Sequence, residues 1–530
     1  MAGHAIRHLH DPSIAHNRLA GNHPRPGVDS RLPDRAIPFS TANYIAMELT
    51  FEEGTLVLRE WDAADSPPPE FDWDPRRDVY RAQALDYRSV VTRLRRSGVD
   101  YTDSAKDYST VAFDPVEQPA PREYQSEAIE AWAGSGNRGI TVLPTGSGKS
   151  LVGLMAISRV GRSALVVAPT IELMNQWYDL LCEAFAEVSV GLLGGGYHEI
   201  RELTIATYHS AYLHVEQWGN RFGLIIFDEV HHLPGPQFSH AAEMSLAPYR
   251  LGLTATLERP DGRHQLLDRL VGAVNYRQEI QQLAGEYLAR YRVERREVQM
   301  VAEERVAYRA SEAEYRSFLR AKNVTTGSAG WREFVRLSGS SAAGRRAMKA
   351  YREHRRIALG AAAKFEELES ILKAHPRDRV IVFTQDNETV YQISRALLIP
   401  AITHQTRTRE RREILLKFNR GEYLAVLTSK VLNEGVNVPE ANVAVVLSGS
   451  ATIREHVQRL GRILRPREGK EAVLYEVVTK GTMEKEVSRR RRQHAAYAAA
   501  DEGDASAAVG GEEEGEGDGP ARAGADEGGC

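Results

Sequence analysis

The chain has 530 residues, of which 26% are charged and 42% hydrophobic, and its formal net charge is −4. No run approaches the roughly 18 apolar residues of a membrane span, and the first residues lack the apolar core of a signal peptide, so we expect a cytoplasmic protein without membrane contact. The two cysteines, Cys182 and Cys530, fit no metal-binding spacing, which argues against disulfides, zinc ribbons and an iron–sulfur cluster.

Charge and composition differ between the two ends and the body of the chain. Residues 501–530 hold ten acidic residues and one arginine, so a tail charge of −9 leaves +5 on residues 1–500. We expect a disordered acidic tail over residues 491–530 and a disordered leader over residues 1–46, which are rich in His, Pro, Asn and Arg. The start of the protein could be either Met1 or Met47.

A small α/β module is expected over residues 47–118. Residues 49–58 have the pattern of two short strands around a Glu-Gly turn. Residues 87–96 have apolar positions on one side and four arginines elsewhere, which predicts a short helix. The arginines could contact DNA, but a solvated helix face is the favoured interpretation.

A phosphate-binding loop is the most specific signal in the chain. Residues 139–143 predict a buried strand, Gly146 and Gly148 allow a tight turn, and Lys149-Ser150 opens an amphipathic helix. Such a turn before a helix N-terminus forms an anion site, where lysine adds charge and the hydroxyl is a ligand for Mg²⁺. The alternative is a chance Gly-Lys-Ser in a surface loop, and Leu143 stands where the strict motif has Gly. We interpret the loop as a nucleoside triphosphate site.

Two carboxylates follow another apolar run. Residues 222–228 predict a central strand that ends at Asp228-Glu229, and ligands bind at that edge of open α/β sheets. Asp228 is placed to hold Mg²⁺ and Glu229 to accept a proton from water. With strands expected at 164–170, 203–207 and 250–256, residues 119–275 predict a doubly wound parallel sheet, the first lobe.

A second lobe with the same architecture is expected over residues 276–490. Its predicted strands are 379–384, 424–428, 443–447 and 472–477, and it lacks a phosphate loop. It contains Gln458, Arg462 and Arg465, and the two arginines lie about one helical turn apart. That spacing suits two guanidinium groups that reach an anion across a cleft.

Residues 300–356 predict a helical insertion with a basic surface. Residues 331–356 contain eight Lys or Arg and two Glu, with Trp331, Phe334 and Tyr351 interleaved. Contact with a nucleic-acid backbone is favoured over a solvated helix face.

In this order, the motifs resemble those of superfamily 2 helicases. The relevant stretches are Leu143-Pro-Thr-Gly-Ser-Gly-Lys-Ser150, Asp-Glu-Val-His231, Gly252-Leu-Thr-Ala-Thr256, Glu434-Gly435 with Asn437-Val-Pro439, and residues 458–465. The chain looks most like the XPB branch in its short archaeal and bacterial form. Its small first module stands where that branch has a damage-recognition domain, and its basic helices resemble the thumb. Arg259-Pro-Asp261 resembles the Arg-Glu-Asp element, with Pro260 in place of Glu.

The resemblance implies two RecA-like lobes and a role for each matching residue. Arg122 and Gln125 would read adenine, and Thr254 and Thr256 would couple hydrolysis to movement. ATP and Mg²⁺ would be held by Thr145, Gly146, Ser147, Gly148, Lys149, Ser150 and Asp228. Glu229 would be the general base, and Gln458, Arg462 and Arg465 would reach the γ-phosphate. Nucleic acid would contact Pro169, Thr170, Arg259, Asp261, Trp331, Arg345, Arg346 and Thr428.

The expected function is that of an ATP-dependent, nucleoid-associated DNA helicase, moving 3′→5′ in repair or transcription. The resemblance also implies a structure-specific nuclease as a partner. Three alternatives stay open on the sequence: a double-stranded DNA translocase that does not separate strands, an RNA helicase, and a non-enzymatic repair scaffold.

Overall fold

The computed structural model describes residues 47–61, 66–113, 120–185, 188–259, 261–283, 287, 290–325, 328–429, 441–448, 471–485 and 488. The expected leader and tail lie outside these residues, as do Pro260, Gln458, Arg462 and Arg465 and the motif around Glu434. Three sheets make up the described chain. No helix in these ranges is both long and apolar enough to cross a bilayer.

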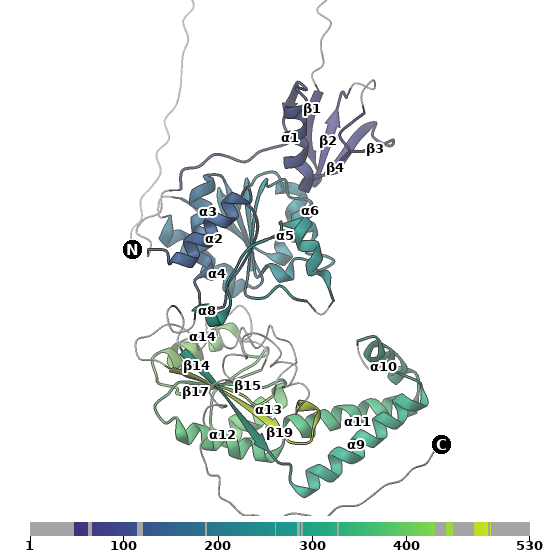
Figure 1. Ribbon diagram of the computed structural model, residues 1–530, viewed down its shortest axis with the longest axis vertical. Helices are drawn as coiled ribbons and strands as arrows, with labels where there is room; N and C mark the ends of the chain where they lie inside the picture. Colours follow the sequence, from purple (N-terminus) through teal and green to yellow (C-terminus); the bar gives the residue numbers. More distant parts are fainter. Residues whose placement is uncertain are drawn as a thin grey trace, which may run out of the picture. The chain divides into compact units, whose positions relative to one another are not determined.

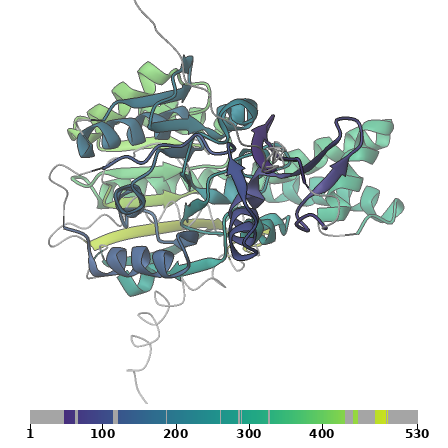
Figure 2. The ribbon, with the colours of Figure 1, turned by 90° about the horizontal axis from the view of Figure 1, so that it is seen from above.

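The first sheet forms the N-terminal module, with strand order β3-β4-β2-β1-β5 (Figures 1 and 2). Its elements are β1 (Met47–Glu52), β2 (Thr55–Arg59), β3 (Asp72–Asp74), β4 (Val79–Gln83), η1 (Ala84–Asp86), α1 (Tyr87–Arg96) and β5 (Tyr101–Asp103). Glu53 and Gly54 connect the antiparallel strands β1 and β2, and both have positive φ. A two-residue turn with positive φ at both positions has the same twist as the strands that it joins, which favours this hairpin. Val90, Val91 and Leu94 of α1 are buried in the module's core. The predicted strand pair and helix are confirmed.

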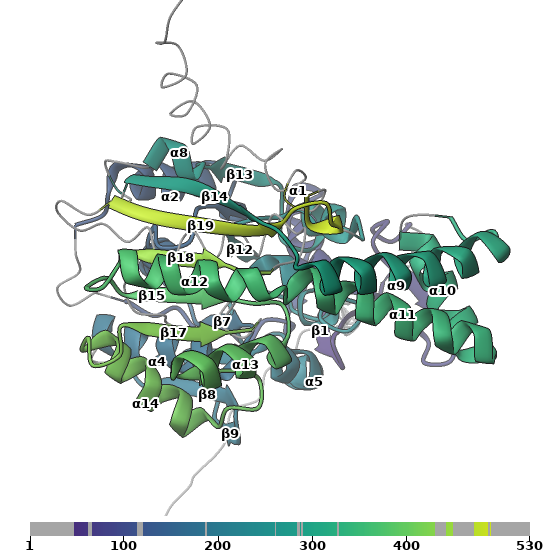
Figure 3. The same ribbon diagram turned by 90° about the horizontal axis from the view of Figure 1, so that it is seen from below.

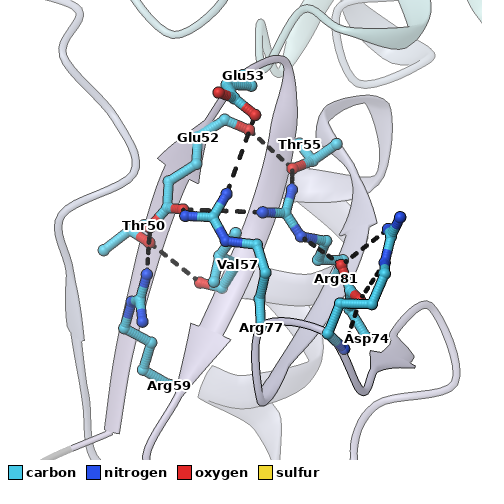
Figure 4. Close-up of polar contacts among 10 residues, drawn as sticks. Thr50, Glu52, Glu53, Thr55, Val57, Arg59, Asp74, Arg77 and Arg81 are labelled. Atoms are coloured by element: carbon cyan, nitrogen blue, oxygen red, sulfur yellow. Dashed lines mark hydrogen bonds and ion pairs between the residues drawn. The ribbon is translucent and has the colours of Figure 1, made fainter.

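An ion-pair network covers one side of this sheet (Figure 4). Glu52 accepts a hydrogen bond from Arg59 at 2.6 Å and lies 3.5 Å from Arg77 and 3.9 Å from Arg81. Arg81 is also 3.5 Å from Asp74. The hydrogen bond from Arg59 lowers the pKa of Glu52, and the neighbouring guanidinium charges add to the effect. The arginines on this side therefore already have carboxylate partners.

The second sheet has the order β13-β6-β12-β11-β7-β10-β8-β9, and only the β8–β9 pair is antiparallel. Its strands are β6 (Arg138–Val142), β7 (Ala164–Ala168), β8 (Val190–Gly194), β9 (Tyr197–His198), β10 (Leu203–Thr207), β11 (Leu224–Asp228), β12 (Tyr249–Thr254) and β13 (Val274–Arg277). The predicted doubly wound lobe is confirmed, although the β8–β9 hairpin was not expected. Strand β13 pairs in parallel with β6 and forms one edge of this sheet.

Helices cover both faces of the second sheet (Figure 1). One core lies beneath α2 (Glu123–Gly134), α3 (Lys149–Val160) and α4 (Ile171–Ala184). The other lies beneath α5 (Tyr208–Trp218), α6 (His240–Glu243) and α7 (Leu267–Leu270). The short elements of this region are η2 (Val230–His232), η3 (Arg263–Leu266) and α8 (Ile280–Leu283). With both faces covered, most residues of the central strands are apolar, as the sequence indicated.

The third sheet is entirely parallel in the order β14-β19-β18-β15-β17-β16 (Figure 3). Its strands are β14 (Arg290–Val298), β15 (Val380–Phe383), β16 (Ala401–Ile402), β17 (Ala425–Thr428), β18 (Val443–Val446) and β19 (Glu471–Thr479). Helices α12 (Ala362–Ala374) and α13 (Asn387–Leu397) pack on one face, and α14 (Thr408–Asn419) packs on the other. Two RecA-like lobes are therefore present.

The predicted basic insertion is helical and lies between β14 and α12. It consists of α9 (Ala302–Ala321), α10 (Ser328–Ser340) and α11 (Ala342–Leu359), and α9 and α11 lie side by side (Figures 1 and 3). Phe318 and Phe334 pack with Tyr351 in a small aromatic core. This core holds α9, α10 and α11 together through their apolar sides. Most charged residues of α11 lie on its other side and are exposed.

Candidate active site

The phosphate loop lies between β6 and α3. Gly146 and Gly148 have φ of +86° and +78°, a region that side chains with a Cβ rarely adopt. A Cβ at Gly148 would also lie 2.6 Å from Gln125 Nε2. Lys149 Nζ is 3.4 Å and 3.5 Å from the carbonyl oxygens of Leu143 and Pro144, so the ammonium group lies within the curve of the loop. The loop thus has the geometry of an anion site.

Side chains of α2 and its N-cap hold the loop in place. Tyr124 Oη donates to the Ser147 carbonyl at 2.6 Å, and Gln125 Nε2 donates to the same oxygen at 2.8 Å. Gln125 Oε1 accepts from the Arg122 amide at 2.9 Å, so both ends of this amide bond to backbone. Arg122 lies 5.8 Å from the centre of the Tyr287 ring. The structure therefore bonds Gln125 directly to the phosphate loop, whereas Arg122 is linked to it through the Tyr124 hydroxyl at 3.0 Å.

One hydroxyl of the loop is unsatisfied. Thr145 Oγ1 is buried and has no hydrogen-bond partner among the described residues, whereas Ser147 Oγ donates to the Pro144 carbonyl at 2.7 Å. A buried polar group without a partner is costly, so a ligand oxygen at this position would stabilise the loop.

The two carboxylates lie at the end of β11, separated from β6 only by β12. Asp228 is 7% exposed, and Glu229, next in the chain, has φ of +47°. Burial, together with the charge of Glu229, raises the pKa of Asp228 to about 6, although the Trp177 hydrogen bond and the charge of Lys149 oppose the shift. A divalent cation would offset this cost, and a carboxylate with the Ser150 hydroxyl supplies the oxygen ligands that Mg²⁺ prefers. The residues fit a Mg²⁺ site.

Thr254 connects Glu229 to the segment after β12. Its Oγ1 is 3.3 Å from Glu229 Oε2 and 2.9 Å from His231 Nδ1, and it donates to the Thr256 carbonyl at 2.8 Å. Arg259 in turn donates to the His231 carbonyl at 2.6 Å and pairs with Asp261 at 2.7 Å. A continuous set of polar contacts thus runs from the Glu229 carboxylate to the element that resembles Arg-Glu-Asp.

Trp177 is a site residue that sequence reasoning missed. Its Nε1 donates to Asp228 Oδ2 at 2.9 Å, while the Glu229 amide donates to Oδ1 at 3.0 Å. A Cβ at Gly153 would lie 2.7 Å from Trp177 Cη2, so this glycine leaves room for the ring. The indole is 2% exposed. In the sequence, Trp177 is indistinguishable from any apolar residue on the inner face of a helix.

We expect Trp177→Phe to raise the Mg²⁺ concentration needed for half-maximal ATP hydrolysis by roughly tenfold, because hydrogen bonds to charged groups contribute about 1.5–3 kcal/mol. Phenylalanine keeps most of the packing but loses the donor to Asp228. The measurement is a Mg²⁺ titration of the hydrolysis rate. Trp132→Phe is the matched control, since this equally buried indole donates to the Arg250 carbonyl, away from the site. Identical Mg²⁺ dependence in the two variants would contradict the positioning role.

The expected nucleic-acid residues occupy different environments. Pro169 and Thr170 follow β7 and are half-buried, and Thr170 Oγ1 caps α4 by accepting from the Leu173 amide at 3.2 Å. Thr428 is fully buried at the end of β17. Trp331 is 43% exposed, and its ring centre is 5.0 Å from that of Tyr351. Arg345 and Arg346 are exposed on α11, and Arg346 forms an ion pair of 3.9 Å with Glu314. Of this set, the structure offers the α10–α11 residues most openly to a ligand.

Three family models match the chain. Residues 49–105 match the xeroderma pigmentosum group B helicase damage recognition domain, and residues 118–259 match the res subunit of type III restriction enzymes. Residues 346–499 match the ERCC3/RAD25/XPB C-terminal helicase. The matches cover most of the N-terminal module, most of the first lobe, and the second lobe from within α11 onward, but not β14, α9 or α10.

The chain is also similar to individual proteins along most of its length. It is 39% identical to the DNA 3′-5′ translocase XPB2 of Sulfurisphaera tokodaii over 432 residues, which are 81% of this chain and 97% of the relative. It is 33% identical to the DNA 3′-5′ helicase XPB of Mycobacterium tuberculosis, over 70% of this chain and 63% of that relative. The helicase domain of Pyrococcus furiosus Hef aligns with a TM-score of 0.49 and 19% identity, over 70% of this chain and 97% of that domain.

Proposed function

The chain belongs to the XPB family of superfamily 2 helicases, and we propose that it hydrolyses ATP to move along DNA in the 3′→5′ direction, in repair or transcription. The observation that carries this proposal is the convergence of Lys149, Asp228, Glu229 and Thr254 at the carboxyl ends of β6, β11 and β12. A scaffold that only binds ATP would need a nucleotide pocket. It would not need two adjacent carboxylates, such as Asp228 and Glu229, at that pocket.

Each residue has a defined task in this reaction. Lys149 and the loop amides would bind the phosphates, and Ser150 and Asp228 would hold Mg²⁺, which neutralises charge on the phosphate oxygens when bound. Trp177 keeps Asp228 in one orientation. Glu229 would accept the proton of the attacking water, and Thr254 fixes the position of that carboxylate through a contact of 3.3 Å.

The second half of the catalytic site would come from the other lobe. We propose that Gln458, Arg462 and Arg465 reach the γ-phosphate when ATP and DNA bring the lobes together. Arg122 and Gln125 would then recognise adenine, for which Gln125 must exchange its hydrogen bonds to the backbone for the edge of the base. Thr254 and Thr256 would transmit the change towards Arg259. An arginine that arrives only on closure makes hydrolysis depend on the conformational step, so each ATP is used for movement.

We propose that DNA is contacted by Pro169, Thr170, Arg259, Asp261 and Thr428 along the two lobes and by Trp331, Arg345 and Arg346 on the helical insertion. We propose that the chain is divided into a damage-recognition-like module (47–118), a first lobe (119–275) and a second lobe (276–490). A structure-specific nuclease is the proposed partner. Translocation on duplex DNA without strand separation is a second candidate, in line with the word translocase, rather than helicase, in the name of the Sulfurisphaera relative.

The proposal is tested by ATP hydrolysis measured in parallel without nucleic acid and with RNA, single-stranded DNA or duplex DNA. We expect DNA to raise kcat several-fold and RNA to have little effect. Stimulation by RNA alone would replace the DNA motor with an RNA helicase. Hydrolysis that no nucleic acid alters would contradict movement on either polymer.

A further inference from the structure

A positively charged pocket lies where α1 of the N-terminal module meets the turn between α2 and β6. Its volume is about 650 Å³. Arg88, Arg93 and Arg96 line it from α1, and Arg138 lines it from β6. Hydroxyl groups complete the lining, among them Ser97 and Ser135. The sequence favours a solvated helix face over DNA contact for the arginines of residues 87–96; the structure places three of them around a pocket.

Backbone carbonyls hold two of the four guanidinium groups. Arg88 donates to the Gly136 carbonyl at 2.6 Å, and its side chain also lies against Tyr249, 5.7 Å from the ring centre. Gly136 has φ of +71°, and a Cβ there would lie 2.9 Å from Arg88 Nη2, so glycine permits this approach. Arg138 donates to the Val271 carbonyl at 3.3 Å. These groups are therefore positioned before any ligand binds.

The positive charge of the pocket is only partly neutralised. Glu70 pairs with Arg93 at 3.0 Å, and Asp86 lies close enough to Arg138 to act on its charge. Burial and the nearby charge of Arg88 nevertheless lower the pKa of Arg138. Arg96 is exposed and forms no ion pair with a described residue. The arginines on the sheet side of the same module are neutralised more completely than those of the pocket, because they pair with Glu52 and Asp74 (Figure 4).

The composition of the lining indicates the class of ligand. Guanidinium groups bind phosphate oxygens without reading sequence. The hydroxyls of Ser89, Thr92 and Ser135 already donate to backbone carbonyls, so the arginines are the donors that a ligand would meet. No aromatic side chain is among the described lining residues, so the pocket offers no surface on which a base could stack. Proteins that bind single-stranded nucleic acid stack the bases on such surfaces. The lining therefore suits backbone phosphates.

We propose that this pocket binds backbone phosphates of duplex DNA at the junction between the N-terminal module and the first lobe. The inference rests on the proposed function, since it assumes that DNA is the track. It adds a contact on the opposite side of the module from the ion-pair network. A phosphate held here would attach the module and the first lobe to the same stretch of DNA.

The test compares Arg96→Gln with Arg95→Gln. Both residues are exposed on α1, but only Arg96 lines the pocket, so Arg95 is a matched control for loss of one charge. Binding of a fluorescein-labelled duplex is measured across a series of salt concentrations. Each phosphate contact contributes about 0.9 to the slope of log K against log salt. We expect Arg96→Gln to weaken binding several-fold and to reduce that slope by about 0.9, while Arg95→Gln leaves the slope unchanged.

Equal slopes for the two variants would overturn the pocket assignment. Competition by inorganic tripolyphosphate distinguishes a free anion from DNA: if Arg96→Gln weakens tripolyphosphate binding but leaves duplex binding intact, the pocket binds small anions and the proposal is wrong. Failure of the proposed function is separately visible, because the unaltered chain would then show no DNA-stimulated ATP hydrolysis. Hydrolysis without DNA should be the same in both variants, since neither residue touches the ATP site.

Discussion

Glu229→Gln is expected to lower kcat for ATP hydrolysis by about 10²–10⁴-fold, the usual contribution of a general base, while ATP still binds. Glutamine has nearly the same shape as glutamate, so it can occupy the strained backbone position with φ of +47° and keep the contact to Thr254. It cannot accept the proton of the attacking water. The measurement pairs steady-state hydrolysis with equilibrium binding of a fluorescent ATP analogue.

Glu130→Gln serves as the control for loss of a negative charge in the same lobe. Glu130 is exposed on α2 and pairs with Arg159 at 2.6 Å. Exposed pairs of this kind contribute only about 0–1 kcal/mol, so its loss should leave kcat unchanged. Turnover by purified Glu229→Gln at the rate of the unaltered chain would remove Glu229 from the reaction.

Arg465→Ala is expected to lower kcat by about 10³–10⁵-fold, the range found for arginines that stabilise charge on a transferred phosphoryl group. This expectation rests on the spacing of Arg462 and Arg465 and on their match to a helicase motif. ATP affinity should change little, because Lys149 and the loop amides supply the ground-state contacts. DNA should no longer stimulate hydrolysis, and that loss separates a transition-state role from a binding role.

Arg395→Ala is the matched control for an arginine of the second lobe. Arg395 is exposed on α13, within the same lobe but outside the motif. Its substitution should leave both kcat and DNA stimulation intact. If Arg465→Ala hydrolysed ATP with undiminished DNA stimulation, the site would be complete within the first lobe and the two-lobe mechanism would fail.

The positions of the candidate catalytic residues followed from a topological rule. In a parallel sheet the carboxyl ends of all strands share one edge, so apolar runs that end in Gly-Ser-Gly-Lys, Asp-Glu or Thr-Ala-Thr predict one site. The structure places the three ends on neighbouring strands in the order β6-β12-β11. The glycine turn was predictable for a different reason. Gly146 and Gly148 have positive φ, which glycine adopts without steric cost.

Contacts between distant segments were not predictable. Trp177 reaches Asp228 across 51 residues, and Tyr124 reaches Ser147 from the helix before the loop, yet both have the pattern of ordinary core residues. Strands β13 and β14 were missed because arginine and tyrosine interrupt their apolar character. The pocket at α1 was missed because its fourth arginine, Arg138, comes from a different domain from the first three.

Hydrolysis-dependent displacement of a strand from DNA tests the central claim most directly. The unaltered chain is incubated with a forked duplex and with a triplex, each with ATP or with a non-hydrolysable analogue, and Glu229→Gln is run beside it. We expect ATP to release a strand from at least one substrate, with no release in the presence of the analogue or by the variant. DNA-stimulated ATP hydrolysis with release from neither substrate would contradict a motor that moves on DNA.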